Sequence, residues 1–423
     1  MIALHRKSRR VLATAATAVL LAAASACGPS TEDGKLVLEF PSWQADDESF
    51  SPFWHELIDA YEDEHPDVEI DFYQVPFDSF VAQQTTRFAA GDPPDIVHLP
   101  SSNAVEFAAR GWLAPIDDRL AGTDVLEEWT PLQEQMKWDG RYYGLLLLGY
   151  GYALFYNEQL LADAGVPVPE TPEQLLTAAR AVSEQQGDSF GFGATTVQNP
   201  DNYTELTSFL VGNGGSWSEP DGRITAESAD ARTALEQYRQ VLATAPAGIQ
   251  SQQRNELFLN GQIAMLIDGP FLLSEVDSAA PEVREHLKVT APPFEVVPGG
   301  VSNSLHLAAG SEPEVADAVW EFVELASQPR WQERYTQLTG VPAPREGSVT
   351  EQALSETPEL ELFARLADEA VDIFPESPQL RRNYGRVGDA VASAAIRLLA
   401  TDQPVERVAQ SLQRDLEGVG DDD

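Results

Sequence analysis

A regular alternation of strand patterns with helix patterns is the feature that most constrains the fold of this chain. Residues 35–40 and 96–99 are short apolar runs, and residues 68–72 alternate apolar with polar side chains, so all three segments predict strands. Between the strands at 35–40 and 68–72, the segment that Pro52 opens carries apolar side chains at helical spacing up to residue 61, which predicts a helix. The alternation predicts an α/β lobe with a mostly parallel sheet.

A second lobe is predicted after residue 150. Residues 145–148 form an apolar strand pattern that runs through two glycines into another apolar stretch at 153–156. Helix patterns follow near residues 172–185, 229–244, 388–400 and 405–417. A chain of 423 residues is long enough for two or three domains.

The first thirty residues have the order of a secretory signal peptide. An apolar run at 11–24 follows a positively charged start and ends in small residues before Cys27. This order predicts removal of residues 1–26. The run is shorter than the ~20 residues that span a bilayer, and an uncleaved membrane anchor is the alternative. The charges at the start are Arg6, Lys7, Arg9 and Arg10.

Cys27 is the only cysteine, so the chain forms no internal disulfide. Residues 24–28 resemble the lipobox of bacterial lipoproteins, with Ala24 where leucine is usual. The resemblance implies a lipid on Cys27, a flexible tether over residues 27–34, and a position on the extracytoplasmic face of the cell membrane. One acyl chain binds a membrane only marginally, so a stable anchor needs two or more.

Composition and motifs disfavour several function classes. A net charge of −41 repels nucleic acid and anionic lipid headgroups. His55 and Glu56 begin like a zinc-protease helix, but Asp59 stands where the second histidine would be. We find no serine-hydrolase elbow, phosphate loop or dinucleotide fingerprint, and we expect no metal, cofactor or catalytic residue. A surface glycosidase or lyase stays as an alternative, because 68 acidic residues supply carboxylate pairs.

Several segments, in order, resemble the extracellular solute-binding proteins of sugar ABC importers, the maltose-binding protein family. The resemblance begins at Lys35 and covers nearly all of the rest of the chain. The segments are FAAGDPPDIV at 88–97, GWLAPID at 111–117, LFYN at 154–157, FLNGQIAM at 258–265, GPF at 269–271 and TGVP at 339–342.

The resemblance implies a two-lobe, type II periplasmic-binding-protein-like α/β fold with a ligand cleft between the lobes. The N-lobe would comprise residues 35–147 plus 292–342, and the C-lobe residues 150–290 plus 346–423, with crossings near 147–151, 291–295 and 341–345. The implied function is capture of a sugar, without catalysis, and delivery to a membrane permease driven by a separate ATPase. The binding protein itself would be a monomer.

A sugar presents apolar faces and a rim of hydroxyls, so its site should combine aromatic rings with convergent polar groups. Residues 43–46 follow the first strand, at the carboxyl edge where α/β sheets bind ligands. Trp217 follows a glycine-rich turn, and we expect it to be exposed. The predicted ligand-binding residues are Trp43, Gln44, Asp46, Ser102, Asn103, Tyr150, Trp217, Asp268, Phe271, Arg382 and Tyr384.

Some of these residues have a second interpretation. Ser102 and Asn103 could cap the next helix, and Trp43 could pack in a core. Phe271 stands where the family commonly has a stacking tryptophan, and Tyr384 aligns with another stacking aromatic of the family. We expect Arg381 to form a surface ion pair.

Other ligands and another class stay open. An arginine in the cleft would favour an anionic ligand such as a glycerophosphodiester. Asp46 and Asp268 facing each other would favour a cation such as a polyamine. A scaffold or adhesion lipoprotein would lack a ligand-sized cleft.

Overall fold

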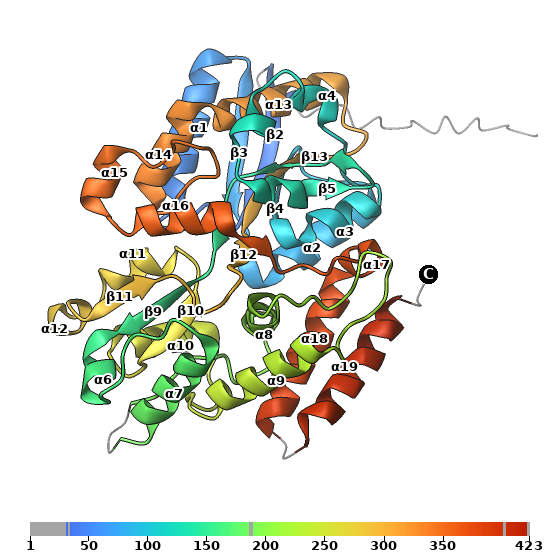
Figure 1. The fold of residues 1–423 in the computed structure, drawn as a ribbon. Coiled ribbons are helices and arrows are strands. Elements are labelled where there is room, and N and C mark those ends of the chain that lie inside the picture. Colours follow the sequence, from blue (N-terminus) through green and yellow to red (C-terminus); the bar gives the residue numbers. More distant parts are fainter. Residues whose placement is uncertain (1–30, 33, 186–188, 401–402, 421–423) are drawn as a thin grey trace, which may run out of the picture.

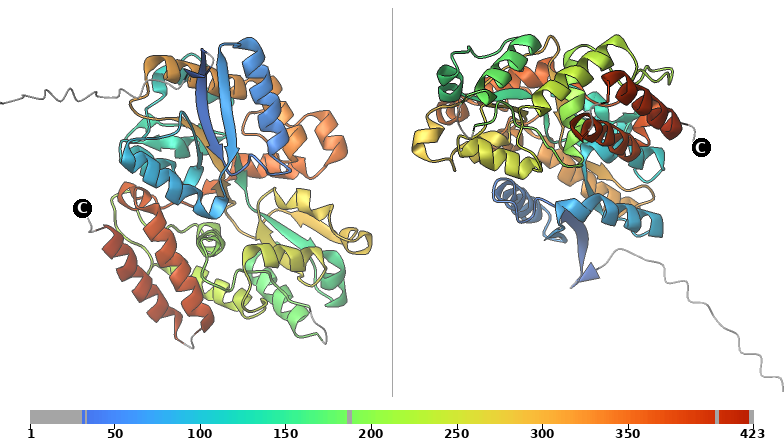
Figure 2. Two further views of the ribbon diagram at one scale, coloured as in Figure 1. Left: turned by 180° about the vertical axis from the view of Figure 1, so that it is seen from behind. Right: turned by 90° about the horizontal axis from the view of Figure 1, so that it is seen from below.

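The structure, a computed structural model, describes residues 31–32, 34–185, 189–400 and 403–420. The predicted signal peptide and Cys27 lie outside these residues. The described chain forms two lobes, with the N-lobe above and the C-lobe below in Figure 1. The C-terminal helices belong to the lower lobe, as the view from behind in Figure 2 also shows.

The N-lobe contains both early and late segments of the chain. Its elements are β1 (Thr31–Glu32), β2 (Lys35–Ser42), α1 (Ser51–Glu64), β3 (Val68–Gln74), α2 (Phe77–Ala90), β4 (Ile96–Pro100), the 3-10 helix η1 (Ser101–Asn103), α3 (Ala104–Ala109), α4 (Asp117–Leu120), α5 (Val125–Glu128), the 3-10 helix η2 (Pro131–Met136), β5 (Lys137–Trp138), β6 (Arg141–Tyr142), β7 (Leu145–Leu146), β13 (Asn303–Leu307), α13 (Pro313–Ser327) and α14 (Pro329–Thr339).

The C-lobe is built around β9, which pairs with β10 on one side and β11 on the other. Helices α8, α9, α18 and α19 pack together beside this sheet. Its elements are β9 (Ala153–Asn157), α6 (Glu158–Asp163), α7 (Pro172–Ser183), α8 (Asp201–Gly212), α9 (Ala229–Leu242), α10 (Ser251–Leu259), β10 (Met265–Asp268), α11 (Leu272–Val276), α12 (Pro281–Arg284), β11 (Leu287–Thr290), α17 (Pro378–Arg381), α18 (Tyr384–Ala400) and α19 (Val405–Gly420).

A small sheet lies where the chain passes between the lobes. Strand β12 (Pro298–Val301) pairs with β8 (Gly149–Gly151) on one side and β14 (Val371–Asp372) on the other. Helix α16 (Leu360–Glu369), which follows α15 (Glu351–Glu356), packs on β8. A Cβ at Gly151 would lie 2.5 Å from the Leu366 carbonyl oxygen, so this contact requires glycine. The lobe boundaries given above stay a prediction.

The expectation of a mostly parallel sheet is wrong for the described strands. The parallel pairs are β2 with β3 and β12 with β14, and the remaining pairs are antiparallel. In the N-lobe, β13 returns from the C-lobe and runs against both β4 and β7. The α/β class is as expected, because helices connect many of the strands. The sheets are mostly antiparallel because strands such as β13 return from the other lobe in the opposite direction.

Buried helix faces follow the apolar spacing of the sequence. In α1 the buried side chains recur every three or four residues, and the hydroxyl of Tyr61 donates to the Ala318 carbonyl of α13 at 2.8 Å. Thr171 caps α7 by accepting from the Gln174 N–H, and Pro172 stands at the first helical position. Among the described residues, no helix has both the length and the apolar character needed to cross a membrane.

Candidate ligand-binding site

Two neighbouring cavities lie around the segment that leads from β14 into α18. The larger, about 320 Å³, lies between α8, the loop after it and residues 371–376. The smaller, about 10 Å³, lies where η1 of the N-lobe meets α18 of the C-lobe. Phe374 and Arg381 line both cavities, so the two form one candidate site divided by these side chains.

Both cavities mix aromatic and polar side chains. Those of the larger one are Thr207, Ser216, Trp217, Asp372, Phe374, Glu376 and Arg381. Those of the smaller one are Ser101, Ser102, Phe374, Arg381 and Tyr384. The lining of the larger cavity suits an amphipathic ligand with flat apolar faces and hydrogen-bonding groups. The smaller cavity has room for about one water molecule.

Three aromatic rings form a continuous edge-to-face group at the site. Tyr384 contacts Phe374 with 5.1 Å between ring centroids and Tyr203 with 5.2 Å. Tyr203 is buried, and its hydroxyl donates to the Ile373 carbonyl at 2.5 Å. This bond fastens the segment before Phe374 onto α8.

The expectation that Trp217 is exposed is wrong, because only 1% of the side chain is accessible. Gly214 adopts a positive φ of 79°, and the turn returns the chain to α8. There the indole N–H of Trp217 donates to the Thr207 hydroxyl at 2.9 Å. Trp217 is therefore a core residue of the C-lobe that also lines the larger cavity.

Arg381 is not the surface residue that we expected. Its guanidinium donates to the Gln135 side-chain oxygen at 2.5 Å, and the Gln135 amide donates to Asp372 at 2.5 Å. Burial lowers the pKa of Arg381 and raises the pKa of Asp372. Because Gln135 belongs to η2 and Arg381 to α17, these bonds connect the two lobes. The adjacent Arg382 is half-buried.

A second group of predicted residues meets beside the crossing strand β8. Tyr150 is 7% exposed and lies edge-to-face with Phe271 at 5.4 Å and Tyr152 at 5.3 Å. Asp268 is buried, and it forms an ion pair with Arg254 and accepts from the Gly269 N–H at 2.8 Å. Its carboxylate is thus already paired within the C-lobe.

Sequence reasoning missed Asp201, which lies in the first turn of α8. Burial raises the pKa of Tyr384, and the neighbouring Tyr150 and Asp201 raise it further. Asp201 belongs to the same first turn of α8 as Tyr203, whose ring packs on Tyr384. The signal in the sequence was the Asn199–Pro200 turn that opens the helix, but an acidic residue in a first helical turn is ordinarily explained by the helix dipole.

The remaining predicted residues lie on the N-lobe. Trp43 is half-buried and stacks on His98 with 4.1 Å between ring centroids. Gln44 is buried and accepts from the Trp54 indole at 2.9 Å. Asp46 is exposed. None of these three predicted residues is among those that line the two cavities.

The residues after β4 lie at the contact between the lobes. Ser102 lines the smaller cavity, and its hydroxyl is 3.4 Å from the Asn103 side-chain oxygen. Asn103 precedes α3 but makes no side-chain capping bond. The capping interpretation of these residues is therefore not supported by the geometry.

We searched the described residues for a cluster of side chains that could bind a metal ion. Among these residues, no group of three or more His, Cys, Asp or Glu side chains could hold a metal ion. The site accordingly offers hydrogen bonds, ring faces and a small number of charges to a ligand.

Comparison with known proteins gives consistent results for sequence and structure. The family described as bacterial extracellular solute-binding protein matches residues 47–333. The diacetylchitobiose binding protein DasA of Streptomyces coelicolor is 24% identical over 357 residues, which are 79% of this chain and 81% of that protein.

Two solved structures share the fold. The GacH receptor of Streptomyces glaucescens, studied unliganded and with acarbose, has a TM-score of 0.78 at 22% identity, over 91% of this chain and 98% of that one. The sugar-binding protein MalE of Xanthomonas citri has a TM-score of 0.77 at 20% identity, over 90% and 97%. These similarities establish the two-lobe fold implied by the sequence.

Proposed function

The chain belongs to the bacterial extracellular solute-binding protein family, and we propose that it captures a saccharide between its lobes for an ABC importer. The observation that carries the proposal is the lining of the two cavities around Phe374. Aromatic rings of Trp217, Phe374 and Tyr384 there accompany the polar groups of Thr207 and Arg381. Rings pack against the apolar faces of a sugar, and polar groups satisfy its hydroxyls.

The printed names of relatives support the same ligand class. DasA is named for diacetylchitobiose, and the GacH receptor was studied with acarbose. The charges at the site also favour an uncharged ligand, because Asp372 and Glu376 line the larger cavity together with Arg381. An anion at Arg381 would lie beside these carboxylates.

The proposed mechanism is capture by lobe closure without chemistry in this chain. The contacts of Gln135 with Arg381 and Asp372 join the lobes, and Ser102 faces Tyr384 across the smaller cavity. A ligand that contacts both lobes would stabilise a closed form by its differential affinity for that form. The closed protein would then dock on a membrane permease whose transport is driven by a separate ATPase.

We further propose that the protein acts as a monomer anchored by lipid at Cys27 on the outer face of the cell membrane. The lipobox-like residues 24–28 support the anchor. A tethered binder stays close to its permease. The lobe boundaries at 35–147 plus 292–342 and 150–290 plus 346–423 belong to the same proposal.

The test is a titration of the purified mature chain with maltose, maltotriose, diacetylchitobiose and mannitol. Binding is measured by the change in intrinsic fluorescence and in melting temperature. At least one should change the fluorescence and raise the melting temperature. Tyr384→Ala should weaken that binding by about tenfold, the loss of one stacking contact. Tyr156→Ala is the matched control, because Tyr156 is also half-buried but does not line either cavity.

The alternatives enter the same titration. Spermidine or glycerophosphocholine binding in place of every sugar would overturn the saccharide assignment. Turnover of an oligosaccharide by the purified chain would favour a surface glycosidase instead.

A further inference from the structure

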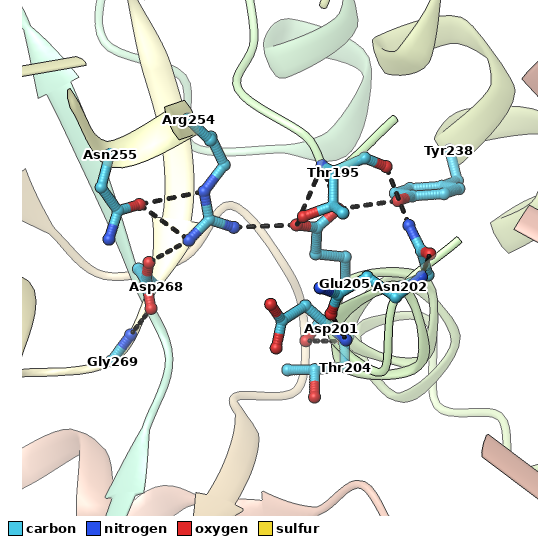
Figure 3. Close-up of polar contacts among 12 residues, drawn as sticks. Thr195, Asp201, Asn202, Thr204, Glu205, Tyr238, Arg254, Asn255, Asp268 and Gly269 are labelled. Carbon is cyan, nitrogen blue, oxygen red and sulfur yellow. Dashed lines mark hydrogen bonds and ion pairs between the residues drawn. The ribbon is translucent and has the colours of Figure 1, made fainter. Parts of the chain in front are cut away.

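Arg254 lies at the centre of a buried ionic cluster in the C-lobe (Figure 3). It projects from α10, and its side chain is 6% exposed. One terminal nitrogen pairs with Glu205 of α8 at 2.8 Å, and the other pairs with Asp268 at the end of β10. Two further N–H groups donate to the Asn255 side-chain oxygen at 3.1 and 2.9 Å. One guanidinium thus joins α8, α10 and β10.

Glu205 extends the cluster to two further segments, the loop before α8 and helix α9. Its carboxylate accepts from the Thr195 hydroxyl at 2.7 Å, from the Thr195 N–H at 2.9 Å and from the Tyr238 hydroxyl at 2.8 Å. Asn202 donates to the Thr195 carbonyl at 2.8 Å. The first two turns of α8 are therefore held by contacts with Thr195, Tyr238 and Arg254.

The charges of the cluster depend on Arg254. Glu205 and Asp268 are both buried, and burial raises the pKa of each carboxyl while Arg254 lowers it. A buried carboxylate that loses its partner is strongly destabilised. Arg254 thereby allows two acidic groups from different elements to lie side by side.

Arg254 joins α8 to β10, and each of these elements carries or leads to a ring that packs on a predicted ligand-binding tyrosine: Tyr203 on Tyr384, and Phe271 on Tyr150. Asp268 accepts from the Gly269 N–H, and Gly269 leads to Phe271, which packs on Tyr150. A Cβ at Gly269 would lie 2.7 Å from the Phe271 ring and 2.9 Å from Tyr150, so the close approach of this turn to both rings requires glycine. On α8, Asp201 lies four residues before Glu205 and hence on the same helix face.

We propose that Arg254 is a positioning residue for ligand binding. It fixes the turn of Gly269 and Phe271 relative to the first turn of α8, so that Phe271 packs on Tyr150 while Tyr203 packs on Tyr384. The proposal rests on the proposed function for the identity of the ligand. The contacts that define this geometry all lie within the chain itself.

The experiment compares the wild-type mature chain with three variants. Arg254→Met leaves two buried carboxylates unpaired and serves as the severe case. Arg254→Met combined with Glu205→Gln and Asp268→Asn removes every charge of the cluster, and it keeps the fold accessible if the single variant unfolds. Arg87→Met is the matched control, because Arg87 forms a bidentate pair with Glu39 at 2.6 Å within the N-lobe.

The first readout needs no ligand. Hydrogen exchange of peptides covering residues 199–206 and 266–276 should be faster in the triple variant than in wild type, and unchanged in the control. Wild-type exchange rates in both peptides of the folded triple variant would overturn the positioning role. This readout tests the positioning role of Arg254 without a ligand. If no saccharide binds the wild-type chain, that result refutes the proposed function but leaves this test of the positioning role valid.

The second readout is the dissociation constant for the saccharides named above. The folded triple variant should bind about tenfold more weakly, the loss of one well-placed ring contact with the ligand. A purely structural cluster would lower the melting temperature and leave the affinity of the folded protein unchanged. Unchanged affinity together with faster exchange would therefore overturn the role in binding.

Discussion

Two histidines buried in the N-lobe should make the protein lose stability as the pH falls below about 6.5, the pKa of an unperturbed histidine. His98 and His306 are each 1% exposed and lie on the paired strands β4 and β13. One nitrogen of His98 is 3.0 Å from the Ser42 hydroxyl, and the nitrogens of His306 contact the Tyr143 carbonyl at 2.8 Å and the Ser304 hydroxyl at 2.7 Å. Burial lowers the pKa of His98 to about 3 and that of His306 to about 4.

The sign follows from which state binds the protons. Above pH 6.5 both states are neutral at these histidines, so they add no pH dependence. Between pH 6.5 and the folded pKa values the unfolded chain binds more protons, so the free energy of unfolding decreases as the pH falls. At pH 5 the unfolded state gains about 2 kcal/mol per histidine, and about 4 kcal/mol for the pair.

The assay is urea unfolding at pH 7.5 and pH 5.0 for wild type, His98→Gln, His306→Gln and the double variant. Other groups titrate in this range, so the informative quantity is the difference between wild type and variant in the pH-induced loss. Each single variant should lose about 2 kcal/mol less than wild type between the two pH values. His98→Gln also removes the ring that stacks on Trp43. The His306→Gln variant decides the question if that loss destabilises the fold at both pH values. Equal losses in wild type and His306→Gln would refute the reasoning.

Three further substitutions test other parts of the structure. Gly151→Ala should lower the free energy of unfolding by about 1–3 kcal/mol, because its Cβ would overlap the backbone of α16, whereas Gly385→Ala, with open space around the new atom, should not destabilise in urea unfolding. Gln135→Ala removes the side-chain bonds between the lobes, so it should weaken saccharide binding and increase the radius of gyration in small-angle scattering. A radius identical to that of wild type in both the free and the bound protein would contradict this role of Gln135. Cys27→Ala should release a competent binder into the culture medium, as measured by fractionation, and membrane retention of that variant would refute the anchor.

The fold could be predicted from the sequence further than the site could. Strand and helix order depends on local spacing, which is visible at residues 35–99. The direction of strand pairing is not local, because β13 joins β4 from a distant part of the chain. Ser102 and Tyr384, predicted from strand ends and resemblance, do meet at one cavity.

Side-chain partners account for what the sequence did not reveal. The sequence near Asp268 does not indicate that its carboxylate pairs with Arg254. The sequence near Gln44 does not indicate that its side-chain oxygen accepts from the Trp54 indole N–H. Trp217 follows a polar, glycine-rich turn, yet its N–H finds the Thr207 hydroxyl inside the lobe. Burial of polar groups depends on such pairings, and they form only once the elements are packed.

The strand order β4–β13–β7 affects how the chain can fold during its synthesis. β4 ends at Pro100 and β13 begins at Asn303, so the N-lobe sheet lacks a central strand until most of the chain has been synthesised. An N-terminal segment emerging alone has an open strand edge and cannot close its core. The N-lobe sheet can therefore be completed only after residues 303–307 have been synthesised.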